Sequence, residues 1–259
     1  MGILRSDLLT HSQLEPSGSV LFDGNSDYLS WSSHSSLKMG TSDFTLEAWV
    51  NITGNNDDNL HQTIFMAGDS SDAGEMVFQM IRDTGGGGSA LGSGADREIG
   101  IRVAGTGYYS GQQITFNQWH HVALVREKGI STATQNASPE GKGRRMYVNG
   151  VFAGSVYDGG ARVLTDQSTA TENLFLGFGE HTGDNYFDGL MTHVHYVDGT
   201  AYPASTFGET DSTSGIWKPK TAPTVTYGTN GFFLKFENSG NLDLEINTNL
   251  FCIKSVSYT

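Results

Sequence analysis

The sequence predicts an all-β protein in which antiparallel strands form two sheets packed face to face, with little helix. Two runs of alternating apolar and polar residues, 118–126 and 144–155, flank a loop, and the second contains the pair Asn149-Gly150. This pair predicts a type I′ hairpin because both residue types tolerate positive φ. Among 259 residues, 34 glycines, five prolines and an aromatic fraction of 11% are typical of strands joined by tight turns. Such strands bury one face and leave the other in water, so we expect two packed sheets.

Strand-like segments follow one another along the whole chain. In 44–50, Phe, Leu, Ala and Val alternate with Thr, Glu and Trp, so Trp49 is expected to face away from the main apolar set. One sandwich suits this chain length, since all-β folds often run to about 200–250 residues as a single domain. The predicted strands are 19–22, 28–31, 44–52, 63–67, 76–82, 98–103, 114–116, 119–126, 145–148, 151–156, 174–178, 189–197, 231–236 and 249–258.

Breaks in this pattern divide the chain into three parts. Residues 1–15 are mixed in character and run into Glu15-Pro16-Ser17-Gly18, which breaks any preceding structure, so they predict an N-terminal arm. Residues 16–207 hold the predicted sandwich. Residues 208–259 begin as a loop-like stretch and end in further strands, which either complete a sheet or contact a neighbouring subunit.

The charge balance and the apolar pattern exclude several classes of partner. Fifteen basic against 28 acidic residues give a net charge of −13, which repels nucleic acid and anionic membranes. No stretch approaches the ~20 apolar residues of a membrane span, and no secretion signal is visible at the N-terminus. Cys252 is the one cysteine, so we expect no internal disulfide and an inert, packed thiol.

Five segments, taken in order, resemble the laminin G-like branch of the concanavalin A-like lectin/glucanase superfamily, and together they span about residues 18 to 200. The resemblance implies a jelly-roll sandwich of two curved antiparallel sheets, a fold shared by lectins, pentraxins and some glycoside hydrolases. The segments that carry it are 20–29, 44–50, 119–126, 146–150 and 186–190.

The segment 202–236 is similar to structural proteins of tailed bacteriophages, particularly those of aquatic phages. This second resemblance implies a virion protein, either a capsid decoration or a tail-fibre-associated component, that is assembled in the host cytoplasm and released by lysis. It also implies other virion proteins as partners and a homo-oligomer. A carbohydrate-binding adhesin that recognises host-surface glycans is the alternative function.

No catalytic cluster stands out, and we expect no enzyme activity. Glycoside hydrolases need two carboxylates across the scissile bond. The best local pair is Asp243 and Glu245, which share a strand face but lie outside the sandwich and lack a third acid. A nucleophile elbow of the Gly-x-Ser-x-Gly type is also missing. A glycoside hydrolase is therefore the least favoured reading.

One turn carries candidate calcium ligands, although no cofactor is required. Asp23, Asn25 and Asp27 place oxygen-bearing side chains at alternate positions, as at the start of a calcium loop. The alternative is a solvated turn whose side chains cap backbone amides. The resemblance implies that calcium could bind at a rim, as it often does in related sandwiches. A frequent family form has Asp-Glu where this chain has Thr192-His193, and this difference weakens the inference of a calcium site from the family.

Histidines of two predicted strands differ in the faces they occupy. His193 and His195 are two apart and are expected to share a face, where a surface pair is the commoner reading and a transition-metal site with a third ligand is the alternative. His120 and His121 are expected to point to opposite faces, so that one is packed and the other is wet.

Three aromatic residues in predicted loops are candidates for stacking on sugar rings. Tyr108 and Tyr109 lie between two predicted strands and beside several glycines, and Trp217 lies in a second loop. Aromatic faces suit the CH groups of sugars, whereas the alternative for each residue is an anchor that packs its own loop.

Overall fold

A computed structural model describes most of the chain. Backbone and side chains are described for residues 18–31, 42–53, 61–68, 75–81, 97–103, 107–128, 143–156, 174–179 and 185–236, and the backbone alone for 106, 244–246, 251–254 and 257–258. These residues form antiparallel strands and one short 3-10 helix, η3 (Ala204–Thr206). The predicted arm 1–15 and the glycine-rich stretch 83–94 lie outside the described residues.

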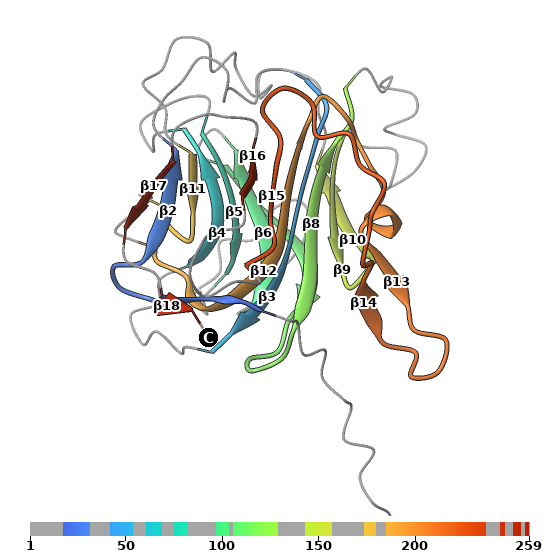
Figure 1. Cartoon of the computed structure of the whole chain (residues 1–259), viewed down its shortest axis with the longest axis horizontal. Coiled ribbons are helices and arrows are strands. Elements are labelled where there is room, and N and C mark those ends of the chain that lie inside the picture. The colour runs from blue at the N-terminus through green and yellow to red at the C-terminus, as the bar shows by residue number, and fades with distance from the viewer. Residues whose placement is uncertain are drawn as a thin grey trace, which may run out of the picture.

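Within the described residues the strands form two large sheets and one small one (Figure 1). The nine-stranded sheet has the order β10 (Val151–Val156), β9 (Arg144–Val148), β8 (His120–Arg126), β3 (Phe44–Ile52), β12 (Asp188–Asp198), β1 (Val20–Asp23) and β18 (Ser257–Tyr258), with β15 (Phe232–Leu234) paired to β12 and β16 (Leu244–Ile246) paired to β15. The seven-stranded sheet has the order β17 (Phe251–Lys254), β2 (Tyr28–Trp31), β11 (Leu174–Leu176), β4 (Gln62–Ala67), β5 (Met76–Met80), β6 (Glu98–Val103) and β7 (Thr106–Gln113). A separate hairpin joins β13 (Gly208–Thr210) and β14 (Trp217–Pro219).

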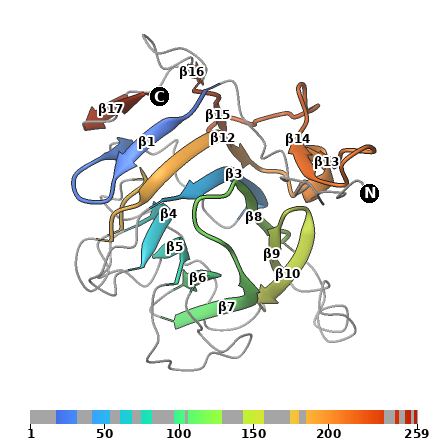
Figure 2. The same ribbon diagram turned by 90° about the horizontal axis from the view of Figure 1, so that it is seen from below.

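The two large sheets pack as layers around one apolar core, as the resemblance implied (Figure 2). Alternate residues of each strand face inward, which is why Leu46 and Val50 of β3 are buried against the opposite sheet. Ring contacts cross between the layers: Phe65 stacks on Tyr196 at 6.2 Å, and Trp31 stacks on Phe232 at 4.8 Å. The predicted sandwich is therefore confirmed. Among the described residues, no helix is long or apolar enough to span a membrane.

The C-terminal part of the chain adds to both sheets of its own sandwich. β15 pairs with β12 and β18 pairs with β1 in one sheet, while β17 pairs with β2 in the other. Phe232, Leu234 and Phe236 belong to the main core. The segment that follows the family-like region is thus part of the same packed body.

The hairpin predicted at Asn149-Gly150 is confirmed. Both residues have positive φ, 50° and 75°, and they connect β9 to β10. The side-chain Oδ1 of Asn149 also accepts a hydrogen bond from the backbone amide of His121 at 3.0 Å, which ties the turn to β8.

Two predictions about the 104–116 region are wrong. The expected loop around Tyr108 is strand β7, and the expected strand 114–116 is an irregular connection and turn. β7 forms because it pairs along the whole of β6, with Tyr108 opposite Ile101 and Tyr109 opposite Gly100. The glycines near it read as loop signals locally, but pairing with a distant strand overrides that tendency.

Candidate functional site

The predicted calcium turn is held together by its own carboxylates. Asp23 Oδ1 accepts hydrogen bonds from the backbone amides of Asn25, Ser26 and Asp27 at 2.9, 2.7 and 3.0 Å, and Asp23 Oδ2 accepts one from the Ser26 hydroxyl at 2.8 Å. Asp27 Oδ2 accepts a hydrogen bond from the Asp23 amide at 3.2 Å, while Asn25 is exposed. Both oxygens of Asp23 therefore serve the turn, which fits the capping alternative.

A carboxylate that the sequence reading missed lies beside this turn. Asp188 on β12 pairs with Asp23 across the sheet, and the approach is close enough that a Cβ on Gly24 would lie 2.7 Å from the Cβ of Asp188. Partial burial raises the pKa of Asp188, the charge on Asp23 adds to this rise, and a hydrogen bond from Thr53 opposes it. For Asp23, burial also opposes ionisation, but the amide and hydroxyl donors lower its pKa to about 2.

The described residues contain no group of three His, Cys, Asp or Glu side chains arranged to hold a metal ion. Calcium binding at Asp23, Asn25 and Asp27 stays a prediction. A β-bulge between Thr192 and His195, with φ of 47° at His193, interrupts the alternation of β12, yet His193 and His195 both contact the ring of Phe233. No third ligand joins them in a metal-binding group among the described residues.

The three predicted sugar-stacking residues do not form one platform. Tyr108 packs against the main core, whereas Tyr109 is a partly exposed residue on the outer face of the seven-stranded sheet. There the ring of Tyr109 lies over two glycines, since a Cβ on Gly100 would lie 3.0 Å from the ring and one on Gly107 would lie 2.9 Å from its hydroxyl. Larger residues at either position would displace this ring.

Trp217 lies on β14, away from both tyrosines. Its indole is packed between Gly150 and Gly208, where an added Cβ would come within 2.6 and 2.4 Å of ring atoms. The indole Nε1 is buried and has no hydrogen-bond partner among the described residues. The structure therefore places Trp217 as an anchor of the β13–β14 hairpin, the alternative considered for it.

An aromatic cluster on the outer face of the seven-stranded sheet was not predicted. Phe178 stacks on Tyr28 at 5.0 Å and contacts Tyr186 at 4.9 Å and Phe175 at 5.2 Å between ring centroids. Tyr28 and Tyr186 are partly exposed. The residues come from β2, from β11 and from the segments that follow β11 and precede β12. Because they are far apart in the sequence, their spacing along the chain does not predict the cluster.

On the outer face of the nine-stranded sheet, a glutamate lies between two histidines. Glu47 on β3 has Oε2 2.8 Å from Nε2 of His121 on β8 and Oε1 3.3 Å from Nε2 of His195 on β12. The three side chains are at most 2% exposed. The cross-strand register explains the meeting, because Glu47 is directly opposite His195 and Trp49 is directly opposite His121. His121 is therefore the packed histidine and His120 the partly exposed one, as the alternation predicted.

Residues 199–230, here called the strap, cover this cluster. The strap leaves β12, crosses the outer face of the sheet, and returns to β15, which pairs with β12. Its aromatic rings contact the histidines: Trp217 lies 5.9 Å from His121, and Phe207 and Tyr227 lie 5.0 and 5.9 Å from His195. Trp49 is covered as well, at 2% exposure and outside the main core.

Burial sets the protonation of the cluster. It raises the pKa of Glu47, and contact with His121 opposes that rise. Burial also lowers the pKa of His195 well below its ordinary value, and the neighbouring His193 and His121 add to the effect. A carboxylate and two imidazoles are a familiar catalytic set, but here they are sealed beneath the strap. The arrangement is one that holds the strap in place.

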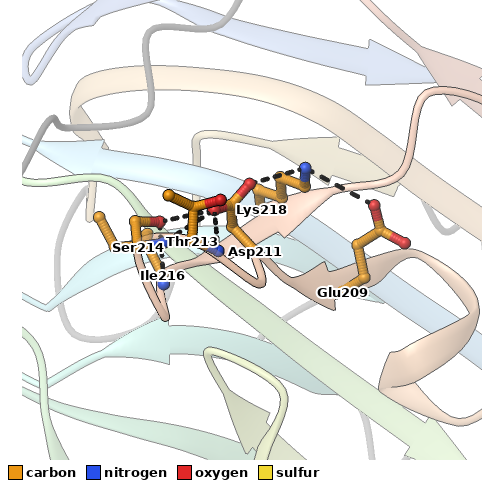
Figure 3. Close-up of polar contacts among 6 residues, drawn as sticks. All are labelled: Glu209, Asp211, Thr213, Ser214, Ile216 and Lys218. Atoms are coloured by element: carbon orange, nitrogen blue, oxygen red, sulfur yellow. Dashed lines mark hydrogen bonds and ion pairs between the residues drawn. The ribbon is translucent and has the colours of Figure 1, made fainter.

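The strap also carries an ordered hairpin that stands at the side of the sandwich (Figure 1). At its turn, Asp211 Oδ1 accepts hydrogen bonds from the amides of Thr213 and Ser214, both at 2.9 Å, and Lys218 donates to Asp211 Oδ2 at 3.0 Å (Figure 3). Glu209 lies 3.8 Å from the same ammonium group. The backbone donors and Lys218 lower the pKa of Asp211, and the hairpin keeps its shape while its surface stays exposed.

The predicted acid pair near the C-terminus is described only in part. Asp243 lies outside the described residues, and for Glu245 only the backbone of β16 is described. The expected lack of enzyme activity stays a prediction.

Comparison with known proteins identifies the family. The laminin G-type model of the concanavalin A-like lectin/glucanases superfamily matches residues 23–205, which is more than half of the chain, and the chain belongs to that superfamily. The resemblance seen in the sequence is thereby confirmed. A search of curated proteins found no matching relative.

Two solved structures share the fold. A candidate carbohydrate-binding protein from Bacteroides ovatus superposes with a TM-score of 0.55 at 18% identity, covering 95% of this chain and 60% of that protein. A native heptameric SAP-like pentraxin from Limulus polyphemus superposes with a TM-score of 0.53 at 13% identity, covering 93% of this chain and 94% of the pentraxin. The protein thus has a lectin-like sandwich, and it spans less than two thirds of the Bacteroides protein.

Proposed function

We propose that this member of the concanavalin A-like lectin/glucanase superfamily is a non-catalytic structural protein of a bacteriophage particle, either a capsid decoration or a fibre-associated component. One observation carries the proposal. The segment 202–236, whose sequence suggested the resemblance to phage structural proteins, covers the outer face of one sheet and reaches the core at Phe232. The phage-like segment and the lectin-like sandwich are therefore one folded unit rather than a domain and a loose tail.

Two further features support this proposal. The buried Glu47, His121 and His195 are used to seat the strap, which leaves them closed to a substrate. The β13–β14 hairpin stands at the side of the sandwich with an ordered, charged turn (Figure 3). An exposed hairpin with a hydrogen-bonded, charged turn suits contacts with neighbouring copies or other virion proteins, and we propose it as such a contact in a homo-oligomer.

The test is to purify phage particles from the source culture and identify this chain in them by mass spectrometry, followed by cryo-electron microscopy. Density at regular capsid positions, or along a fibre, supports the proposal and distinguishes its two forms. A chain that remains in the soluble lysate and never bands with particles overturns it.

Carbohydrate binding is the second candidate, and Tyr109 is the observation that favours it. Tyr109 is partly exposed on an outer face with its ring set over two glycines, whereas Tyr108 packs against the main core and Trp217 packs the strap onto His121. Aromatic faces of this kind stack on the CH groups of sugars. A glycan array probed with and without calcium tests this candidate. Loss of a bound glycan in Tyr109→Ala, but not in Tyr108→Phe, supports it, and silence on the array counts against it.

A further inference from the structure

Both ring nitrogens of His195 have a polar partner. Nδ1 lies 2.8 Å from the hydroxyl of Tyr227 on the strap, and Nε2 lies 3.3 Å from the carboxylate of Glu47. An ionised carboxylate only accepts, so Nε2 donates to Glu47, whereas the Tyr227 hydroxyl can donate to Nδ1 or accept from it. The strap is therefore joined through Tyr227 to a histidine that shares its other nitrogen with the buried carboxylate.

The charge balance of the cluster leaves room for one added proton only. Glu47 supplies one negative charge, 2.8 Å from Nε2 of His121 and 3.3 Å from Nε2 of His195, and this charge can balance one protonated imidazole. His193, on the same strand as His195, adds no negative charge. A second proton, whichever atom binds it, leaves a net positive charge enclosed by aromatic rings, and burial of an uncompensated charge is costly.

Charged groups on the covering elements do not supply the missing negative charge. On the hairpin, the carboxylates of Glu209 and Asp211 are paired with Lys218. Next to β15, Lys235 is itself basic, and its backbone carbonyl accepts a hydrogen bond from Thr192 at 3.1 Å. The described residues that touch the two histidines from the strap and β15 are aromatic: Phe207, Trp217, Tyr227 and Phe233.

We propose that the seat of the strap is a pH-sensitive latch: acidification adds more positive charge to the cluster of Glu47, His121 and His195 than its one carboxylate can balance, and the strap then opens while the sandwich stays folded. The two responses separate because aromatic rings of the strap cover these histidines, whereas its other contacts with the sheet, such as that of the Tyr202 amide with Thr45, do not titrate in this range. The sandwich is held by the apolar core. Both ends of the strap remain attached, since β12 and β15 pair with each other through Val194, His195 and Tyr196.

Proton linkage gives the direction in which pH shifts the equilibrium between the covered and the open strap. In the covered state, burial lowers the pKa of His195, whereas in the open state its pKa returns to about 6.5. Opening therefore takes up a proton below about pH 6.5, and the opening equilibrium rises about tenfold for each further pH unit. The raised pKa of Glu47 has the opposite sign, because it favours the covered state at low pH, and it sets the lower end of the window.

Hydrogen exchange of the intact protein, corrected for the intrinsic pH dependence of exchange, tests this latch between pH 7.5 and pH 5. Informative strap amides are those of Tyr202, bonded to Thr45 Oγ1 at 2.7 Å, and Lys220, bonded to the Phe207 carbonyl at 2.8 Å. We expect their protection to fall about tenfold per pH unit below about pH 6.5. Amides between β3 and β8 are expected to stay protected.

Two variants separate the latch from a general acid effect. His195→Gln keeps a donor toward Glu47 but does not titrate, so the slope of strap protection with pH should flatten. His120→Gln is the matched control, because His120 lies on β8 next to the cluster and bonds Thr115 instead. His121→Gln is the second test variant if His195→Gln folds poorly. An unchanged slope in the glutamine variants, a flat profile in the wild type, or parallel loss of strap and sandwich protection overturns the proposal.

Discussion

On the outer face of the nine-stranded sheet, the strap lays Phe207, Trp217 and Tyr227 over two buried histidines and a glutamate. On the outer face of the seven-stranded sheet, Tyr28, Tyr109 and Tyr186 are all partly exposed. On the nine-stranded sheet, the aromatic and titratable side chains pack against each other and hold the strap in place. Trp217 and Tyr227 are also partly exposed, but their rings are packed over the buried histidines, whereas Tyr109 covers only two glycines of its own sheet. We therefore expect substitutions on the first face to affect stability and those on the second to affect any ligand binding.

The largest effect is expected from breaking the covered cluster. Glu47→Ala leaves two buried imidazoles without their carboxylate, and removing one partner of a buried ion pair costs about 3–5 kcal/mol. Urea unfolding measures this loss. Glu127→Ala is the control, because the Glu127–Arg145 pair at 2.6 Å is much more exposed and such pairs contribute about 0–1 kcal/mol. Equal losses in the two variants would contradict the contrast.

Replacing one aromatic residue on each face separates stability from binding. Trp217→Ala removes the ring packed between Gly150 and Gly208, and we expect a loss of about 3 kcal/mol, near the lower end for large aromatic deletions. Tyr109→Ala removes a partly exposed ring and should cost about 1 kcal/mol or less, while abolishing any glycan binding. Thermal unfolding and glycan binding, measured on both variants, give the two readouts. If Tyr109→Ala lowered the unfolding temperature more than Trp217→Ala, and Trp217→Ala abolished glycan binding, the roles expected for the two faces would be wrong.

A smaller effect is expected at the turn under the strap. Gly150 and Gly111 share left-handed backbones, with φ of 75° and 71°, but a Cβ on Gly150 would lie 2.6 Å from Trp217 whereas one on Gly111 meets nothing within 4 Å. Both substitutions to alanine carry the backbone penalty of about 1 kcal/mol. Gly150→Ala should lose more than that, because the indole must move. Equal urea midpoints for Gly150→Ala and Gly111→Ala would show that the Trp217 indole moves aside at no measurable cost.

The smallest effect is expected at the two turns that are capped by Asp23 and by Asp211. Hydrogen bonds lower the pKa of Asp23 to about 2, so the ionised carboxylate stabilises the fold above about pH 4, and this contribution is lost as pH falls toward about 2. Asp23→Asn should cost below about 1 kcal/mol at pH 6 because the turn is exposed. The cost should shrink at pH 3, as followed by urea unfolding. A pH-independent cost would exclude the ionised cap.

The turn at Asp211 is the matched case for that experiment. Asp211 accepts from two backbone amides where Asp23 accepts from three, and it faces Lys218 at 3.0 Å where Asp23 faces the carboxylate of Asp188. Asp211→Asn should therefore loosen Lys218 as well as the turn. Asp23→Asn should lower the pKa of Asp188 slightly, because burial is the main cause of the raised pKa and the charge on Asp23 adds to it. Carboxyl chemical shifts of Asp188, followed by NMR through a titration, report this change in pKa.

The sequence alone determined the elements whose signals are local. Asn149 and Gly150 define their hairpin through backbone preference, and alternation in 44–50 correctly turned Trp49 away from the main core. The ordered set of family-like segments was also sufficient to identify the fold. These features depend on neighbours in the chain, so they can be read from it directly.

Tertiary structure alone decided which distant residues meet. The β-bulge in β12 shifts His195 opposite Glu47, and pairing with β6 turns the segment around Tyr109 into a strand. Trp217, predicted in a loop, became the anchor of the strap because Gly150, far away in sequence, leaves space for its ring. Strand register, bulges and crossings between layers set these contacts, and they depend on non-local pairing that the period of a single segment does not encode.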